Sequence, residues 1–326
     1  MTVIREGSLV LTVLNEARGL HTFLDSLSAQ STLPAEIVIV DGGSADDTVA
    51  ILSSWAAPDG CTVTVLVESG ASISEGRNIA VSQASYDRIL VTDGGTTMHS
   101  EWVERMLGAF DSPESPHVVG GFFEPVGQTL IERTIAFAVT PELREIDGAT
   151  FLPSSRSLAF VREAWERVGG YPEWLDYCED LVFDMNMKKA GFAFAFVPDA
   201  IVTWSARSSI RSFMKQYFRY ARGDGKASLW WKRHLARYLA YAVGLILLCV
   251  AFFVPWVFVA LAAGFVVYMR KFWARVWNRR SSFGTGVLPA LALVPVIVVA
   301  GDLAKMAGYP IGLRWNAVRT RAKGIR

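Results

Sequence analysis

The chain has 326 residues, enough for one large or two ordinary domains, and its formal net charge is only +1 at pH 7. The charge is nevertheless divided, because residues 1–203 carry 12 Lys and Arg against 29 Asp and Glu, whereas residues 204–326 carry 20 against 2. The basic zone also holds the long apolar runs, which favours an anionic membrane surface over nucleic acid as its partner. The three cysteines, Cys61, Cys178 and Cys249, are far apart in the sequence, which argues against a disulfide framework and a cysteine zinc site.

The first 125 residues alternate short strand-like runs with helix-like stretches. Each run is rich in β-branched residues, and each is followed by a pattern of helical period. The predicted strands are 8–14, 35–40, 62–68 and 88–93. Four such units in succession predict an α/β fold, with a mostly parallel sheet and flanking helices. Ser44 is the expected N-cap of the second helix, because Asp47 follows it at nearly the spacing of a capping box.

Polar residues and glycines follow all four predicted strands. Asn15 and Glu16 follow the first, Asp41 the second, the segment ESGASISEGRN (68–78) the third, and Asp93 the fourth. The carboxyl ends of parallel strands lie at one edge of a sheet, where such folds bind their ligands. We therefore expect a pocket for a polar ligand at this edge. For Asp93, which precedes two glycines, an ordinary Asp-Gly turn is the alternative.

Residues 126–200 are less regular. The sequence predicts a short strand at 157–161 and a helix at about 162–168. A second helix is expected from Asp180 to Ala190, with Gly191 as the glycine that ends it. The strand FAFAFV follows this glycine.

The C-terminal zone has the composition of a membrane-associated segment. Residues 207–237 mix cations with Phe, Tyr and Trp, which is typical of a helix in a membrane interface. The next 31 residues, Leu239 to Met269, carry no charge and would make a helix of about 46 Å, against a hydrocarbon core of about 30 Å. Pro255 lies near the middle, and the basic loop that follows should stay in the cytoplasm, so a tight helical hairpin is favoured over one span. The apolar run 287–300 contains two prolines, and spanning, re-entrant and interfacial placements are all compatible with it.

These patterns predict a cytoplasmic domain, an amphipathic interfacial segment, a set of membrane helices and a basic cytoplasmic tail. The four parts are 1–205, 206–237, 238–308 and 309–326, with the hairpin at about 238–270 and a third apolar segment at about 285–305. The N-terminal stretch turns polar too early for a secretory signal, so the acidic domain is expected to stay in the cytoplasm.

Six segments in this order resemble a known family, although each segment alone is weak. They are TVLNEA (12–17), VIVDGGSADDT (38–48), EGRNIA (75–80), VTDGG (91–95), GGYPEWLDYCED (169–180) and QYFRY (216–220). Together they resemble a family 2 glycosyltransferase with a GT-A fold, of the membrane-attached kind that builds bacterial glycans or glycolipids. The resemblance covers residues 8 to about 225.

The resemblance implies a site for a nucleotide-sugar. The base and ribose would be held by Thr12, Asn15, Glu16 and Asp41, and Arg77 with Asn78 would line the diphosphate side. The motif QYFRY matches a Gln/Arg-x-x-Arg-Trp motif of the family. Its residues Gln216, Arg219 and Tyr220 are therefore expected at the donor, although binding of lipid headgroups is as good an explanation.

The same resemblance implies roles for three acids. Asp93 corresponds to the first acid of an Asp-x-Asp metal motif, and Mg²⁺ or Mn²⁺ is the expected cofactor. Gly95 stands where the second acid would be, but Mg²⁺ commonly uses only one or two protein carboxylates together with substrate phosphates. Glu179 and Asp180 match the family's catalytic acid pair, with Asp180 as the expected general base. Simple capping of the following helix is the alternative for this pair.

We therefore expect an inverting hexosyltransferase that uses a UDP-sugar and a lipid-linked or glycan acceptor at the cytoplasmic face of the inner membrane. No nucleic acid partner is expected. A catalytically inactive subunit that binds nucleotide-sugar or lipid in a glycan assembly complex is the alternative, and the missing second acid is its best support. A nucleotidyltransferase is disfavoured, because NEARGL lacks the glycine-rich basic loop that it would need. The expected site requires the loops at 15–16, 41, 77 and 93 to converge with residue 180 on one crevice.

Overall fold

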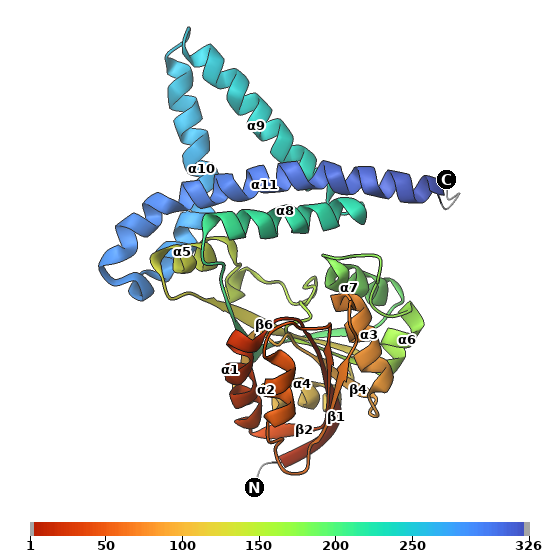
Figure 1. Cartoon of the computed structure of the whole chain (residues 1–326). Helices are drawn as coiled ribbons and strands as arrows, with labels where there is room; N and C mark the ends of the chain where they lie inside the picture. The colour runs from red at the N-terminus through yellow and green to blue at the C-terminus, as the bar shows by residue number, and fades with distance from the viewer. Residues whose placement is uncertain (1–2, 323–326) are drawn as a thin grey trace. The chain divides into compact units, whose positions relative to one another are not determined.

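The four predicted N-terminal strands form one parallel block (Figure 1). They are β1 (Val3–Val13), β2 (Thr32–Asp41), β3 (Thr62–Val67) and β4 (Arg88–Val91). In this computed structural model, which describes residues 3–322, β1 pairs in parallel with both β2 and β4, and β2 pairs in parallel with β3. The carboxyl ends of these strands therefore lie at a common edge, as the sequence predicts.

Four further strands extend this block into an eight-stranded mixed sheet. They are β5 (Thr96–Met98), β6 (Val118–Val126), β7 (Leu158–Val161) and β8 (Phe194–Ser205). The strand order is β3-β2-β1-β4-β7-β6-β8-β5, and β7 pairs antiparallel with both β4 and β6, as β5 does with β8. The expected α/β fold is confirmed, with an antiparallel half beside the parallel one.

Helices cover both faces of the sheet. They are α1 (Ala17–Ser28), α2 (Thr48–Ser54), α3 (Ile73–Gln83), α4 (Trp102–Gly108), α6 (Arg162–Val168) and α7 (Glu179–Lys189), and short 3-10 turns lie at Ala109–Asp111 and Leu143–Glu145. Alternate β1 side chains point to opposite faces, so Leu9 and Leu11 pack with the core under α1 and α4, whereas Val10 packs with the core under α3 and α7. Burial on both faces explains why the strands are almost continuously apolar.

Two local expectations are wrong. Ser44 does not cap the second helix, because its hydroxyl donates to Asp41 instead, and α2 begins at Thr48 with Asp47 in the N-cap position. The strand predicted to end at Val197 continues through Pro198 to Ser205. A side-chain capping box does occur, but at Ser72 and Glu75, where it begins α3.

The chain divides into two compact units. Unit 1 comprises residues 1–124 and 143–205, and unit 2 comprises residues 125–142 and 206–326.

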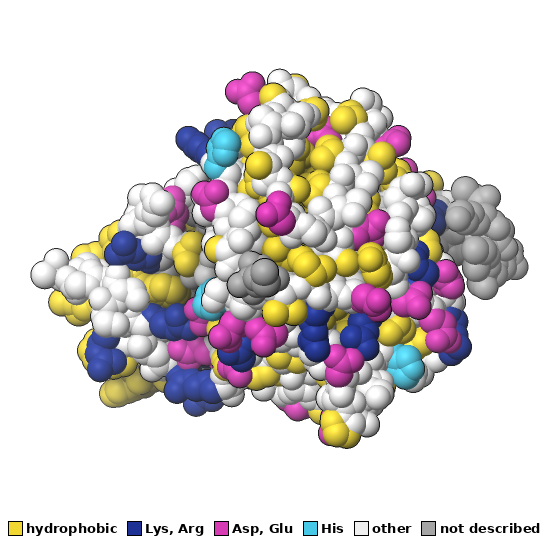
Figure 2. All heavy atoms as spheres, turned by 90° about the horizontal axis from the view of Figure 1, so that it is seen from below, with side chains coloured by type: hydrophobic (Ala, Val, Ile, Leu, Met, Phe, Trp, Pro, Cys, Tyr) yellow, Lys and Arg dark blue, Asp and Glu magenta, His cyan; other side chains and the backbone are white. Residues whose placement is uncertain are grey.

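On the face shown in Figure 2, Asp and Glu side chains lie among Lys and Arg side chains, so this face carries no single basic patch.

Unit 2 is helical. It contains α5 (Leu130–Val139), α8 (Ile210–Lys226), α9 (Trp231–Ala251), α10 (Trp256–Asn278), a 3-10 segment (Arg280–Gly286) and α11 (Val287–Ala322). Three of its helical segments are long and apolar enough to cross a membrane: Trp231–Ala251, Trp256–Asn278 and Arg280–Arg321. A turn at Pro255 separates α9 from α10 (Figure 1), as the sequence predicts for a hairpin. The tip of this hairpin is apolar, with Phe253 87% exposed.

The last apolar run differs from the expectation. It is one helix, α11, which continues through Pro295 and Pro310 to the end of the described residues. Helices α8 and α11 lie side by side (Figure 1), and glycines allow their close approach. A Cβ placed on Gly308 would clash with the carbonyl oxygen of Phe218, and one on Gly312 would clash with that of Arg222.

Polar side chains also join the apolar helices of unit 2. Asp302 of α11 is buried, and its carboxylate accepts hydrogen bonds from Arg237 and Tyr241 of α9 and from Tyr268 of α10. The Arg237 Nε to Asp302 Oδ1 distance is 2.7 Å. A charged group among apolar helices is stable only with such partners, so these contacts fix the register of three helices.

Candidate active site

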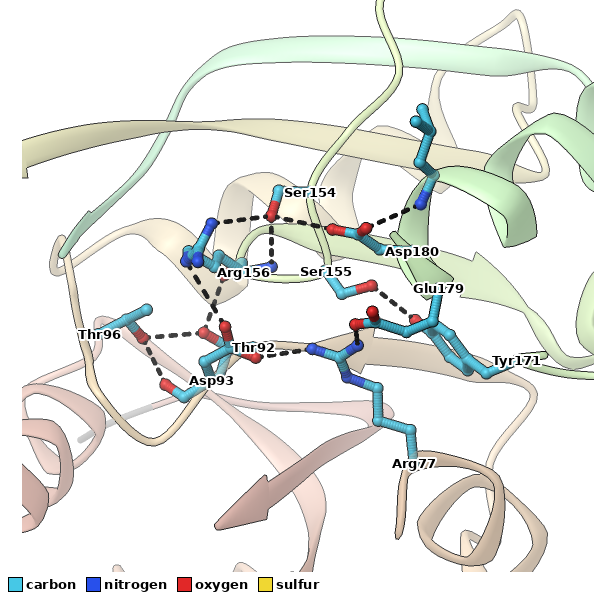
Figure 3. A network of polar contacts seen from close by, with 11 residues as sticks. Arg77, Thr92, Asp93, Thr96, Ser154, Ser155, Arg156, Tyr171, Glu179 and Asp180 are labelled. Carbon is cyan, nitrogen blue, oxygen red and sulfur yellow. Dashed lines mark hydrogen bonds and ion pairs between the residues drawn. The ribbon is translucent and has the colours of Figure 1, made fainter. Parts of the chain in front are cut away.

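Arg77 lies at the centre of a polar network in unit 1 (Figure 3). It comes from α3, and its side chain is only 2% exposed. Nη1 donates to Glu179 Oε1 at 2.9 Å, and Nη2 donates to Asp93 Oδ1 at 2.8 Å. The guanidinium carbon lies 5.2 Å from the centroid of the Tyr171 ring. Arg77 therefore ties the acid that follows β4 to the acid pair that begins α7.

This burial changes the expected role of Arg77. The sequence places it on the diphosphate side, but a guanidinium that is buried and paired with two carboxylates has little surface left for a phosphate. Its observed contacts position Asp93 and Glu179 relative to each other. The network thus accounts for Arg77 without direct contact to a substrate.

The three carboxyl groups of the network are not equivalent. Burial raises the pKa of Glu179 to about 6, the neighbouring Asp180 adds to the rise, and Arg77 opposes it. For Asp93, burial alone would raise the pKa, but Arg77 and Arg156 outweigh it and hold the pKa below its usual value. Asp93 is therefore ionised at neutral pH between two cations.

Asp180 is the more accessible member of the Glu179–Asp180 pair. Glu179 is buried against Arg77, whereas Asp180 is half-buried. Its Oδ1 accepts from the backbone N–H of Leu181 at 2.8 Å, and its Oδ2 accepts a long hydrogen bond of 3.4 Å from the Ser154 hydroxyl. One oxygen is thus engaged by a backbone N–H in the first turn of α7 and the other only weakly, so the contacts at the start of the helix do not exclude the predicted chemical role.

Backbone conformation sets the direction of this pair. Cys178, which precedes it, has φ +66° and occupies the left-handed region, where side chains other than glycine are disfavoured. Asp184, one turn along α7, is fully buried, and neither of its oxygens has a hydrogen-bond partner among the described residues. Burial raises the pKa of Asp184 well above its usual value, which agrees with a neutral structural acid.

Asn78 anchors a loop. Its side-chain oxygen accepts from Tyr171 N at 2.8 Å and from Trp165 Nε1 at 3.0 Å. Its amide nitrogen donates to Tyr171 O and to Glu173, both at 2.9 Å. All four hydrogen-bonding positions of the amide are used, so Asn78 holds the turn before α7 in place. Direct contact with a nucleotide, as the sequence suggests, would require these bonds to break.

The expected base and ribose residues lie on two interlocked loops. Asp41 has no exposed surface, and it accepts hydrogen bonds from Gly43 N, Ser44 N and the Ser44 hydroxyl. Asn15 has φ +56°, and its backbone N–H donates to the same hydroxyl at 2.8 Å. Asp41 therefore organises this loop from inside, while Asn15 stays exposed at its surface.

Thr12 and Glu16 complete this edge of the sheet. Thr12 is half-buried on β1, and its methyl group fills the space in which a side chain at Gly76 would lie. Glu16 is half-buried beside Gly95, because a Cβ on Gly95 would lie 3.4 Å from Glu16 Oε2. An acid at position 95 would thus face another carboxylate, which gives a physical reason for the glycine found there.

Asp93, the residue expected to hold a divalent cation, is engaged by arginines instead, and the described residues show no metal site around it. Its Oδ1 lies 2.8 Å from Arg77, and its Oδ2 lies 3.5 Å from Arg156 Nε, so both oxygens face cations. Within residues 3–322, no group of three or more His, Cys, Asp and Glu side chains could hold a metal ion. Gly94 is also explained by packing, since a Cβ there would lie 2.7 Å from a methyl group of Val13.

No sequence pattern indicates Arg156 or Ser154 as site residues. Both belong to the loop before β7, which has no motif of its own, and they approach the acids only through the antiparallel pairing of β7 with β4.

Gln216, Arg219 and Tyr220 lie on α8 in unit 2, where the Gln216 amide donates to the Tyr220 hydroxyl at 2.7 Å. Their contribution to the donor site stays a prediction.

Comparison with known proteins now identifies the family. The profile for glycosyl transferase family 2 matches residues 8–149, and that for glycosyl transferase family group 2 matches residues 89–301, more than half of the chain. The chain belongs to the family 2 glycosyltransferases. This membership makes it a glycosyltransferase, and it confirms the resemblance drawn from the six sequence segments.

Two curated relatives of this glycosyltransferase show the same relationship. It is 27% identical to glycosyltransferase AglE of Haloferax volcanii over 245 residues, which is 73% of this chain and 78% of AglE. It is 28% identical to the succinoglycan biosynthesis protein ExoA of Rhizobium meliloti over 228 residues, which is 67% of this chain and 68% of ExoA.

Solved structures support the fold. The mannosyltransferase PcManGT of Pyrobaculum calidifontis, in complex with GDP-Man and Mn²⁺, superposes with a TM-score of 0.53 at 18% identity, covering 97% of this chain and 87% of PcManGT. S. aureus TarS gives a TM-score of 0.50 at 19% identity, covering 67% of this chain but only 39% of TarS. The GT-A fold of this glycosyltransferase is therefore confirmed.

Proposed function

We propose that this glycosyltransferase inverts the anomeric carbon as it moves a hexose from a UDP-sugar to a lipid-linked or glycan acceptor. The observation that supports this most directly is the different environment of the two neighbouring acids at the start of α7. Glu179 is buried in an ion pair with Arg77, while Asp180 beside it is half-buried and only weakly engaged through Oδ2. One acid is thus fixed and the other is available to a hydroxyl group.

The proposed chemistry follows from this arrangement. Asp180 accepts the proton of the acceptor hydroxyl, whose oxygen forms a bond to the anomeric carbon of the donor. The bond from that carbon to the diphosphate oxygen breaks on the opposite face, and its electron pair leaves with the nucleoside diphosphate. Asp93 and Asp180 belong to one connected network through Ser154 and Arg156 (Figure 3), which supports the proposal that the base and the donor-side acid act in one region of unit 1.

The nucleotide is proposed to bind over the loops that follow β1 and β2. Asn15 and Glu16 would contact the base and ribose, while Thr12 and Asp41 would act through the loop conformation that they stabilise. PcManGT is described in complex with GDP-Man, so a guanine donor is the nearest competitor to UDP. Gln216, Arg219 and Tyr220 of α8 are proposed to bind the donor as well, because they match the family's Gln/Arg-x-x-Arg-Trp motif.

The membrane is the proposed place of reaction. Three helical segments are long and apolar enough to cross it, and the residues that flank them are strongly basic. Because basic segments stay on the cytoplasmic side, we propose the cytoplasmic face of the inner membrane. A relative named for succinoglycan biosynthesis agrees with a glycan or lipid-linked acceptor.

One observation favours a second candidate, a subunit that binds a nucleotide-sugar without turning it over. Gly95 replaces the second acid of the metal motif, and Asp93 is paired with arginines. This candidate would bind donor without releasing nucleoside diphosphate.

The test is a donor screen on the full-length protein in detergent, with membrane lipid extract as the acceptor and release of nucleoside diphosphate as the readout. Asp180→Asn keeps the size of the side chain but removes the base, so we expect turnover to fall by about 10²- to 10⁴-fold. Asp25→Asn, on the exposed face of α1, is the control and should retain full turnover. Undiminished release by Asp180→Asn would exclude it as the base, and no release from any donor would favour the inactive subunit.

A further inference from the structure

Two adjoining grooves lie on unit 2 where α10 ends and α11 begins. The first has a volume of about 550 Å³ and the second about 410 Å³. Trp277 lines both of them and is 50% exposed. The other lining residues are Arg270, Trp273, Ala274 and Leu291 in the first groove, and Asn278, Arg280, Ser281, Gly284 and Val287 in the second. Together they form one open and mostly apolar surface, the Trp277 groove, with an arginine in each half.

Trp273 gives the wall of this groove a fixed shape. Its Nε1 donates to the carbonyl oxygen of Leu291 at 3.0 Å. In a regular helix this carbonyl would accept from the backbone N–H four residues later, but that residue is Pro295, which has none. The indole therefore supplies the donor that α11 lacks, so the ring cannot turn away without leaving the carbonyl unpaired.

Both arginines of the groove present hydrogen-bond donors at its surface. Arg270 is exposed, and within residues 3–322 its side chain makes no hydrogen bond or ion pair. Arg280 is exposed as well, and its Nη1 donates to the carbonyl oxygen of Trp277 at 3.2 Å. Its guanidinium carbon lies 5.3 Å from the centroid of the Trp277 ring. These contacts hold the guanidinium over the indole and use one of its five N–H donors.

The charge around the groove is one-sided. Residues 270–280 carry five cations and no acid. Glu142 contacts this stretch, where its carboxylate accepts from the Asn278 amide at 3.1 and 3.3 Å. One of the five cations, Arg275, is buried and donates to the Ala138 carbonyl at 3.0 Å. The remaining excess of positive charge favours an anionic ligand that also has an apolar part.

The position of the groove along α10 indicates which anion this is. The uncharged part of α10 ends at Met269, and Arg270 is the first charged residue after it. At about 1.5 Å per residue, Trp277 lies within about 12 Å of that boundary. Tryptophans and cations that follow an apolar run are typical of the level of the lipid headgroups. The anions at this level of a bilayer are lipid phosphates.

We propose that the Trp277 groove binds the headgroup of an anionic phospholipid. Arg270 and Arg280 donate N–H groups to the phosphate oxygens, because a guanidinium matches a phosphate with parallel hydrogen bonds. The indoles of Trp273 and Trp277 contact the glycerol and the first carbons of the chains. This inference does not rest on the transfer reaction and requires only that α9 and α10 enter a bilayer.

Native mass spectrometry of the full-length protein in detergent tests the inference, with phosphatidylglycerol and phosphatidylcholine as the probes. Phosphatidylcholine carries the same phosphate but no net charge, so the wild type should bind it at least about 10-fold more weakly than phosphatidylglycerol. In the double variant Arg270→Gln/Arg280→Gln, the affinity for phosphatidylglycerol should fall by about 10- to 30-fold, because two charged contacts are lost. The affinity for phosphatidylcholine should fall clearly less.

The double variant Lys232→Gln/Arg233→Gln is the matched control. It removes two exposed cations that also lie over tryptophans, at 5.7 Å from the Trp231 centroid and 5.4 Å from the Trp230 centroid, but that line neither groove. Its affinity for phosphatidylglycerol should stay within about threefold of the wild type. Equal losses in the two double variants would show a general attraction to basic residues and overturn the inference. Equal affinity of the wild type for the two lipids would also overturn it.

Soluble competitors distinguish a lipid from other ligands of the groove. Glycerol 3-phosphate carries the phosphate without the chains, so at millimolar concentration it should leave phosphatidylglycerol bound. If it displaces the lipid completely, the groove is a site for a free phosphate and the lipid assignment is wrong. If maltotriose displaces the lipid and glycerol 3-phosphate does not, the tryptophans bind a glycan and the inference is likewise wrong.

Discussion

Asp93 is held between two arginines, and this arrangement determines the effect of removing its charge. In Asp93→Asn the buried Arg77 keeps only Glu179 as a close acidic partner. We expect the free energy of unfolding to fall by about 1–3 kcal/mol, because a hydrogen bond to a buried charge is lost. Chemical denaturation of the detergent-purified protein measures this change.

The protein contains a matched control for this substitution. Asp111 also bridges two arginines, Arg5 and Arg88, but its side chain is 46% exposed. Exposed ion pairs contribute about 0–1 kcal/mol, so Asp111→Asn should be nearly neutral. If both variants lose the same stability, the Asp93 network does not carry the expected energy.

Glu179 should make stability depend on pH. Burial raises the pKa of Glu179 from 4.5 to about 6, so the folded protein binds a proton there more tightly than the unfolded chain does. The resulting stabilisation is present below pH 4.5 and is lost as the pH rises through about 6, a change of about 2 kcal/mol. The free energy of unfolding of the wild type minus that of Glu179→Gln should therefore decrease by that amount from pH 4.5 to 7. A value that stays constant or increases with pH would contradict the assignment.

Sequence patterns located the acids of the site but not their partners. Asp93 and Asp180 stand at a strand end and a helix start, which are features that local sequence reveals. Arg156 and the four bonds of Asn78 depend on contacts between residues about 63 to 95 positions apart, which no local pattern encodes. The burial of Arg77 was also hidden, because a cation next to Asn78 in a helix suggests a ligand as readily as an internal ion pair.

At the scale of elements, the packing of α8 against α11 depends on glycines. Alanine normally stabilises a helix relative to glycine by about 0.5–1 kcal/mol. At Gly308 the added methyl group would instead meet the Phe218 carbonyl, so Gly308→Ala should lower the melting temperature. At Gly244 on α9 no atom lies within 4 Å of the added group, so Gly244→Ala should leave it unchanged or raise it. Melting curves in one detergent compare the two, and equal shifts would argue against close packing at Gly308.

Elements with a clear period were predictable, and those defined by tertiary context were not. The four parallel strands and the helix pair around Pro255 follow from local patterns. The course of α11 does not, because prolines usually end helices, whereas here Pro295 and Pro310 lie inside one. In a membrane-type helix, neighbouring groups compensate for the missing backbone donor. Ser44 is likewise predicted as a helix cap from local spacing alone, whereas in the structure its hydroxyl donates to Asp41 and organises a loop.

At the scale of the whole molecule, the apolar tip between α9 and α10 predicts how the chain meets a bilayer. Helices α9 and α10 are each long enough to cross a membrane, but the uncharged part of each is only about 15 residues, or about 23 Å of helix, which is shorter than a hydrocarbon core of about 30 Å. The tip also offers Phe253 and Trp256 to its surroundings rather than polar side chains. We therefore expect the tip to stay within the membrane.

Thiol labelling of intact spheroplasts measures this placement. A cysteine at Phe253→Cys, in a background in which Cys61, Cys178 and Cys249 are replaced by Ser, should resist a membrane-impermeant maleimide both before and after lysis. Ser281→Cys, on the exposed 3-10 segment, should be labelled only after lysis if that side is cytoplasmic. Labelling of Phe253→Cys in intact spheroplasts would show that the hairpin emerges on the far side.

The route of residues 125–142 has a practical consequence for anyone who wants a soluble catalytic fragment. This stretch leaves the sheet after β6, and its helix α5 buries Ile135 and Ala138 among the C-terminal helices, where Arg275 also donates to the Ala138 carbonyl. A truncated chain that ends at residue 205 would still contain α5 but would lack the C-terminal helices that bury its apolar side chains. The truncated protein would then expose the apolar face of α5. A fragment intended to be soluble must therefore lack residues 125–142 as well as residues 206–326.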